Sequence, residues 1–290
     1  MKTILKLVIC WTAFAVSLPS SWNLISILHL RMNAPVDSTP PTTRLLAFLA
    51  AGAVLVLGLY PLARGLAASR ALLAAVIGLF LFLALGVNTI MEVLTFSNAF
   101  DGAIPGYTLV YAVEVLLVAS ALGVCFGEAR QPAGFPPRSW LAWTGRGAMA
   151  WLAWPVIYFV FGLCVAPIVI PYYTHGGLLG LNIPPLSTIV AVQLVRSLLF
   201  LASSLPLIAL WKGSRPGLWL ALGLAHAVAV GLFGMVSWTA APAVLRATHS
   251  VEITCDSFAY AGLLVLLFTA PAAVKASTEP ALEEPQLRAL

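Results

Sequence analysis

Four residues near the C-terminus are spaced so that they lie on one face of a helix and could act together. Arg246, His249, Glu252 and Asp256 follow one another at steps of three or four residues, which is the repeat of a helical face. Tyr260 continues the same face. Imidazole and carboxylate groups in this arrangement can exchange protons, bind a cation or ligate a metal ion. This face is therefore the first candidate site.

Three further ionisable residues stand inside apolar stretches and join the candidate site. They are Glu92, Glu114 and Arg196. An ionisable side chain at membrane depth costs about 2.5–3.5 kcal/mol on insertion scales, so each requires a partner or a purpose. His226 is also surrounded by apolar residues, but it is alone on a helix of small residues, and we expect it to hydrogen-bond a neighbouring helix.

The elements that position these residues must be membrane helices, because the composition excludes a soluble domain. Apolar residues make up 61% of the 290 residues and charged residues 9%, against roughly 25% charged residues in soluble domains. Apolar runs of about 20 residues are long enough to cross a bilayer. The sequence predicts an all-α bundle of eight spans, at 7–30, 44–62, 71–95, 107–127, 148–171, 187–211, 217–239 and 247–271.

The basic residues predict the orientation of these spans, because cytoplasmic loops are enriched in Lys and Arg. We interpret the first span as retained rather than cleaved as a signal peptide, although a weak Ala13-x-Ala15 pattern exists. With the N-terminus inside, most cations fall on the cytoplasmic side, namely Lys2, Lys6, Arg64, Arg70, Arg130, Arg138, Arg146, Lys212, Arg215, Lys275 and Arg288. Only Arg31, Arg44 and Arg246 fall outside. We therefore predict a plasma (inner) membrane protein with both termini in the cytoplasm.

A duplication is indicated by motifs that recur at an offset of 145 residues. Tyr60-Pro61-Leu62 followed by Ser69-Arg70 reappears as Leu205-Pro206-Leu207 followed by Ser214-Arg215. We predict two parallel four-helix repeats, 1–128 and 147–271, joined by a basic cytoplasmic linker, 129–146, and followed by a disordered cytoplasmic tail, 272–290. Such repeats are related by an axis along the membrane normal, and by analogy a site is expected at the interface between them.

Most of the candidate residues are predicted to lie in the outer half of the bilayer. With about 1.5 Å of rise per residue, Arg196 lies roughly 14 Å below the outer end of its span. Glu114 and Asp256 lie on the order of 10 Å below theirs. Most of these polar residues belong to the second half of the chain, with Glu92 and Glu114 as the contributions of the first.

This placement favours an outward-facing polar cavity that binds or translocates a small solute or ion, with the carboxylates suited to proton coupling. Arg196 would hold an anionic group or a carboxylate partner. The alternative is a membrane-embedded enzyme acting on a lipid or lipid-linked substrate, with His249, Glu252 and Asp256 as acid and base or as a metal site. A second alternative is a non-catalytic membrane subunit in which Arg196 forms a structural ion pair.

Motifs for other chemistry are missing from the sequence. It contains no Walker motif, no dinucleotide-binding fingerprint and no CxxCH, and its four cysteines are isolated. We expect no cofactor, no nucleotide and no nucleic acid. A divalent metal ion at His249, Glu252 and Asp256 is the alternative, for which His175 could supply a further ligand if its loop folds over the site. The expected partners are the lipid bilayer and a small solute, ion or lipid ligand.

Overall fold

The structure is a computed structural model that describes residues 2–32, 38–97, 102–128, 134–174 and 180–269. Within these residues, eight helical segments are long and apolar enough to cross a membrane, so the prediction of an all-helical fold with eight spans is confirmed. The predicted tail 272–290 and His175 lie outside the described residues. The spans are α1 (Thr3–Ile27), α2 (Pro41–Gly65), α3 with η1 and α4 (Arg70–Phe96), α5 (Ile104–Phe126), α6 (Trp140–Thr174), α7 (Leu186–Leu210), α8 with η3 and α9 (Arg215–Ser237) and α10 (Ala243–Phe268).

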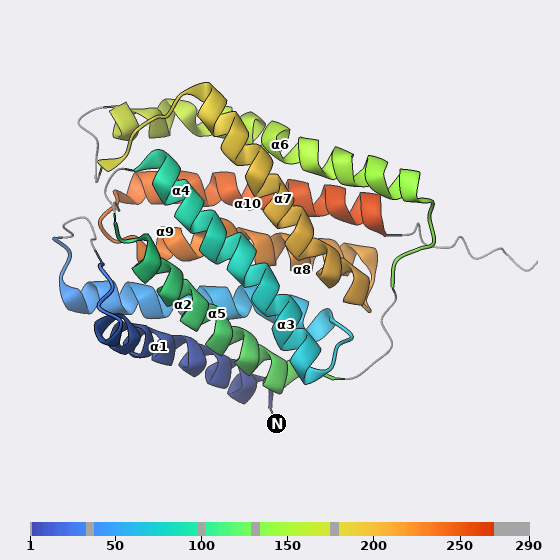
Figure 1. The fold of residues 1–290 in the computed structure, drawn as a ribbon, viewed down its shortest axis with the longest axis horizontal. Coiled ribbons are helices and arrows are strands. Elements are labelled where there is room, and N and C mark those ends of the chain that lie inside the picture. Colours follow the sequence, from blue (N-terminus) through green and yellow to red (C-terminus); the bar gives the residue numbers. More distant parts are fainter. Residues whose placement is uncertain (1, 33–37, 98–101, 129–133, 175–179, 270–290) are drawn as a thin grey trace, which may run out of the picture.

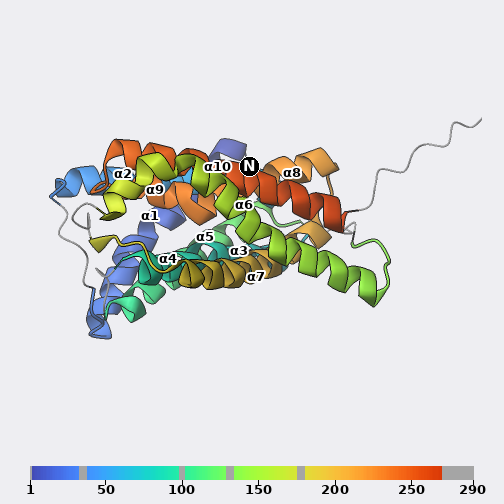
Figure 2. The ribbon, with the colours of Figure 1, turned by 90° about the horizontal axis from the view of Figure 1, so that it is seen from above.

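The helices form two layers that two further helices join at opposite edges (Figures 1 and 2). One layer contains α3, α4, α5 and α7, and the other contains α2, α8, α9 and α10 (Figure 2). Helix α1 packs against α5 of one layer and α2 of the other, and α6 packs against α7 and α10 in the same way. The candidate residues on α4, α7 and α10 are thereby brought toward the middle of the bundle.

The outer surface of the bundle is apolar, as a bilayer requires. Large side chains such as Leu163 and Leu116 are 71% and 65% exposed, whereas the polar residues Gln193 and Ser197 are fully buried. The buried positions are mainly apolar, as in a water-soluble protein, so the apolar outer surface is the feature that sets this bundle apart. The spans therefore imply a lipid environment.

Two of the spans are interrupted by a π-helical segment that the sequence did not predict. In the third span, η1 (Phe82–Val87) separates α3 (Arg70–Leu81) from α4 (Asn88–Phe96). In the seventh span, η3 (Val228–Leu232) separates α8 (Arg215–Ala227) from α9 (Phe233–Ser237). A π segment carries an extra residue per turn and so turns the following residues to a new face, and such segments often occur at functional sites.

Helix α6 begins earlier than the sequence predicts. It starts at Trp140 rather than at residue 148, so that part of the predicted linker is helical. The ring of Trp143 stacks against Phe268 near the end of α10, with 5.7 Å between ring centroids. Packing of these aromatic rings gives the segment a partner that composition alone does not reveal.

Candidate functional site

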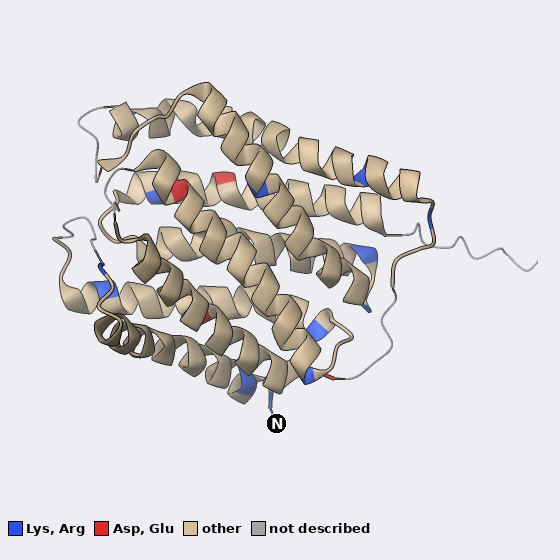
Figure 3. Ribbon diagram, viewed as in Figure 1, with Lys and Arg blue, Asp and Glu red and all other residues tan. Residues whose placement is uncertain are grey.

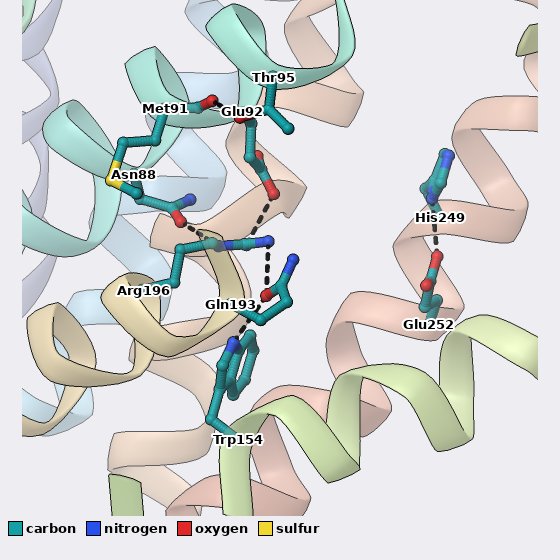
Figure 4. A network of polar contacts seen from close by, with 9 residues as sticks. All are labelled: Asn88, Met91, Glu92, Thr95, Trp154, Gln193, Arg196, His249 and Glu252. Atoms are coloured by element: carbon teal, nitrogen blue, oxygen red, sulfur yellow. Dashed lines mark hydrogen bonds and ion pairs between the residues drawn. The ribbon is translucent and has the colours of Figure 1, made fainter. Parts of the chain in front are cut away.

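Arg196 is buried in the bundle and contacts polar groups from both halves of the chain (Figure 4). Its Nη2 pairs with Glu92 Oε1 at 2.6 Å, and its Nε donates to Asn88 Oδ1 at 2.7 Å. Its Nη1 donates to Gln193 Oε1 at 3.2 Å. Each guanidinium nitrogen therefore has an acceptor, which is what a buried charge requires.

Aromatic rings surround the same guanidinium. Its central carbon lies 5.7 Å from the ring centroid of Trp154, 5.8 Å from that of Tyr158 and 5.6 Å from that of Phe200. Cations within about 6 Å of an aromatic face are attracted by the negative potential of the ring. Trp154 Nε1 also donates to Gln193 Oε1 at 3.0 Å, which fixes the acceptor that Gln193 offers to Arg196.

The π-helical segment η1 determines where two residues of the first half lie, namely Asn88 and Glu92, which contact Arg196. Asn88 is the first residue of α4, directly after η1, and Glu92 follows one turn later. Residues four apart lie on the same side of a helix, so both side chains point toward α7. The π segment thus sets the face that α4 presents to Arg196.

A second polar group lies on α10, formed by His249 and Glu252. His249 Nδ1 is 2.7 Å from Glu252 Oε2, and His249 Nε2 is 3.4 Å from the hydroxyl of Tyr173 at the end of α6. The side chains of His249 and Glu252 are 19% and 8% exposed. A carboxylate that holds one imidazole nitrogen orients the other, as in acid–base pairs.

Glu92, Arg196, His249, Glu252 and Asp256 are here together called the Arg196 cluster. Glu92 interacts electrostatically with Arg196, His249 and Glu252. Asp256 interacts with Glu252 and Arg196. The cluster thus includes residues of α4, α7 and α10.

The Arg196 cluster holds more carboxyl groups than guanidinium groups. It contains three carboxyl groups and one guanidinium, and His249 adds a second positive charge only when it is protonated. Asp256 is 3% exposed, and its Oδ1 is a buried atom without a hydrogen-bond partner in the described structure. Buried polar atoms in proteins are nearly always hydrogen-bonded, and this oxygen can accept a further hydrogen bond.

Glu114 and Arg246 have other surroundings. Glu114 is buried on α5 with its Oε1 unpartnered among the described residues, and Tyr111 lies three residues before it on the same helix. Arg246 donates through Nη1 to the carbonyl oxygen of Met235 at 3.4 Å. Neither residue is among the contacts of Arg196 in the described structure, although both were predicted to share a site with it.

His226 forms the interhelical hydrogen bond that was expected. Its Nε2 is 2.8 Å from Ser204 Oγ on α7, and the rings of Phe80, Phe200 and Tyr260 surround it. It therefore belongs to the core beneath the Arg196 cluster.

The metal and cavity predictions remain predictions. Among the described residues, no three His, Cys, Asp or Glu side chains are grouped so that they could hold a metal ion, and His175 lies outside this part of the chain. Two cavities of the described structure are lined by other residues. One lies between α1 and α2 near Trp22, Arg44 and Phe48, and the other lies at the opposite end near Lys6 and Arg70.

The neutral partners of the cluster were not predicted from the sequence. They are Asn88, Gln193, Trp154 and Tyr158. A signal for two of them exists, because Asn88 lies four residues before Glu92 and Gln193 three residues before Arg196. Polar residues at helical spacing from a buried charge are its natural local partners. The aromatic residues carry no such signal in a chain so rich in apolar side chains.

In comparisons with known proteins, no family model, no curated protein and no solved structure matches this chain. The function must therefore be argued from the geometry.

Proposed function

We propose that this multi-pass membrane protein binds or translocates a small solute or ion, and that the Arg196 cluster takes up a proton or small cation in that process. Two features of the cluster support this proposal. It holds more carboxyl groups than guanidinium groups, and Asp256 Oδ1 has no hydrogen-bond partner among the described residues. A buried carboxylate without a counter-charge is strongly unfavourable at membrane depth. Binding of a proton or cation would balance it.

Arg196 serves as the fixed counter-charge in this proposal. Its three nitrogens already engage Asn88, Glu92 and Gln193. Arg196 was expected either to bind an anionic group of the solute or to pair with a carboxylate of the protein. Its contact with Glu92 supports the second role. Asp256 and Glu252 are then the carboxylates available for the bound proton or cation, and Glu92, with its side chain 36% exposed, is the most exposed carboxylate of the three.

The proposal includes two parallel repeats, with the cluster between them. It is supported by hydrogen bonds that recur at the offset of 145 residues. The backbone N–H of Ala67 donates to Leu210 at 2.8 Å, and that of Lys212 donates to Gly65 at 3.1 Å. Ala67 corresponds to Lys212 and Gly65 corresponds to Leu210 at this offset. Each bond is therefore the counterpart of the other, as a two-fold axis between the repeats requires.

Tryptophan contacts and the π segments support the same relation. Trp11 Nε1 donates to the Leu49 carbonyl at 2.9 Å, and Trp151 Nε1 donates to the Leu194 carbonyl at 2.8 Å. The two accepting residues are 145 positions apart. The segments η1 and η3 begin within one residue of this offset.

Infrared spectroscopy of the purified protein tests the proton site. Protonated carboxylic acids absorb apart from carboxylates, so a pH-difference spectrum reports each acid that gains a proton. We expect such a band in the wild type and its loss or displacement in Asp256→Asn. Glu128→Gln, which removes a carboxylate at the far end of α5, is the control and should leave the band unchanged. A spectrum that Asp256→Asn and Glu252→Gln leave intact would exclude these residues as the proton site.

A second candidate function is favoured by His249, Glu252 and Tyr173. An oriented imidazole next to a hydroxyl is suited to acid–base chemistry on a lipid or lipid-linked substrate. The test is incubation of the protein with vesicles of mixed phospholipids, followed by mass spectrometry. Product formed by the wild type and absent with His249→Gln would support an enzyme, and unchanged lipids in both samples would contradict it for these substrates.

A further inference from the structure

A cavity of about 780 Å³ opens at the end of the bundle where α1 and α3 begin. Four cations line it, Lys6, Arg64, Arg70 and Lys212, and Glu128 is the acidic residue of the lining. The cations come from α1, α2, α3 and the segment after α7, so the fold gathers them from both halves of the chain. Figure 3 shows that Lys and Arg concentrate at this end of the bundle.

The cations of the cavity do not take part in the ion pairs between described residues. Those pairs join Arg196 to Glu92 and His249 to Glu252. Arg64 Nη1 donates to the hydroxyl of Tyr60 at 3.0 Å, which leaves its other nitrogens for a ligand. Four cations and one carboxylate therefore leave the cavity with an excess of three positive charges.

In the second half of the chain, the corresponding end of the bundle is occupied by the protein's own side chains. Arg146 donates to the carbonyl oxygen of Leu267 at 2.5 Å, and Arg138 donates to those of Phe268 and Thr269 at 3.4 and 3.3 Å. The ring of Trp143 packs against Phe268. There the cations satisfy the carbonyl groups at the end of α10, whereas the cavity beside the end of α5 stays open.

We infer that this open cavity binds a phosphate-bearing anion. Arg64 and Arg70 offer the planar donor pairs that match phosphate oxygens, and the first residue of α3 in the lining places a helix N-terminus, with its partial positive charge, at the site. Val124 and Phe126 add apolar surface to the lining. A phospholipid headgroup with its acyl chains fits this combination, and a soluble phosphate compound shares the charged part of it.

Lipid binding to the intact protein in detergent tests the inference. Short-chain phosphatidylglycerol is titrated against short-chain phosphatidylcholine, with bound lipid counted by native mass spectrometry. We expect the wild type to prefer the anionic lipid. We expect Arg70→Gln to bind that lipid about fivefold more weakly, because one basic residue near an anionic headgroup contributes about 1 kcal/mol of binding free energy, which corresponds to about a fivefold change in affinity. Arg215→Gln is the matched control, because Arg215 lies 145 positions after Arg70 and also begins a helix, but it does not line the cavity.

The same titration is repeated with inorganic phosphate and with glycerol phosphate as competitors. Displacement of phosphatidylglycerol in the wild type by either compound supports the phosphate site and identifies a soluble ligand, whereas retention of the lipid identifies a headgroup. Equal binding of both lipids, or equal losses in Arg70→Gln and Arg215→Gln, would overturn the inference. Lys212→Gln provides a second variant at the cavity with the same expected direction.

Discussion

Arg196 is stable in the bundle because every part of its side chain has a partner. Its nitrogens meet one carboxylate and two amide oxygens, and aromatic rings cover its faces. Removing one partner of a buried ion pair leaves the other charge uncompensated, which is more costly than the pair is stabilising. The arrangement is thus sensitive to any change in Arg196 itself.

Arg196→Ala is expected to lower the free energy of unfolding by about 1–3 kcal/mol, because the buried oxygens of Asn88 and Gln193 lose their donor. Arg196→Lys should recover little of this loss, since an ammonium group cannot reach three acceptors in the guanidinium geometry. Denaturant unfolding in detergent micelles, followed by tryptophan fluorescence, gives the comparison. Unchanged stability of Arg196→Ala would show that the ion pair contributes nothing to the fold.

At the residue scale, the sequence predicted which charges are buried better than it predicted their partners. Ionisable residues in apolar runs are conspicuous, so Glu92, Arg196, Glu252 and Asp256 could be identified from type and position alone. Their pairing depends on how helices from different halves approach one another. The packing of α4 against α7 brings Glu92 to Arg196, whereas Glu114 lies on α5, away from this pair.

At the scale of elements, close helix contacts depend on glycine in several places. Gly123 on α5 faces the start of α3, and a Cβ atom at this position would lie 2.6 Å from the carbonyl oxygen of Arg70 and 2.8 Å from Ala74 Cβ. The carbonyl oxygen belongs to the backbone and cannot rotate away. Small residues at such positions allow membrane helices to approach closely.

Gly123→Ala is therefore expected to destabilise the protein by about 1–3 kcal/mol through overpacking between α3 and α5. Gly234→Ala is the control, because an added Cβ there meets no atom within 4 Å, and alanine favours the helix. Thermal unfolding of both variants in the same detergent tests the difference. A loss of stability in Gly234→Ala as large as that in Gly123→Ala would refute the packing argument.

The proposed repeats make a prediction about the two tryptophan hydrogen bonds. Trp11→Phe and Trp151→Phe each remove one indole donor to a backbone carbonyl, and each is expected to lower the unfolding free energy by about 0.5–1.5 kcal/mol. Equivalent elements should give similar values, measured by denaturant titration. A loss in one variant with none in the other would weaken the case for equivalence.

The sequence predicted the existence of all eight spans because apolar length is a strong signal in membrane proteins. It did not predict the π segments η1 and η3, whose residues Phe82–Val87 and Val228–Leu232 look like ordinary apolar helix. The predicted start of α6, at residue 148, was too late, since the helix begins at Trp140. Tryptophan at a membrane boundary occurs both in loops and at helix ends, so it does not mark a helix start. Packing against other helices decides such details.

At the scale of the whole molecule, eight spans predict that both ends of the described chain lie on the same side of the membrane. The basic residues near the starts of α1, α3 and α8 predict that this side is the cytoplasm. The orientation is a prediction that labelling can test directly.

We expect single cysteines at the two ends of the bundle to react from opposite sides of the membrane. In a background without Cys10, Cys125, Cys164 and Cys255, Gly213→Cys should react only after the membrane is opened, and Ser38→Cys should react with an impermeant reagent in intact cells. Both positions are exposed. The reverse pattern would invert the orientation, and labelling of both from one side would contradict the predicted arrangement of spans.

The central claim is that the Arg196 cluster binds a proton or cation within the membrane, and charge displacement measures this without knowledge of a solute. Liposomes containing the protein are adsorbed to a capacitive electrode and given a rapid pH step, then a Na⁺ step at constant pH. We predict a transient current in the wild type and in Glu128→Gln that is lost in Asp256→Asn, with the effective step identifying the ion. Currents in Asp256→Asn and Glu252→Gln equal to those of the wild type, or no current above that of empty liposomes, would contradict the account.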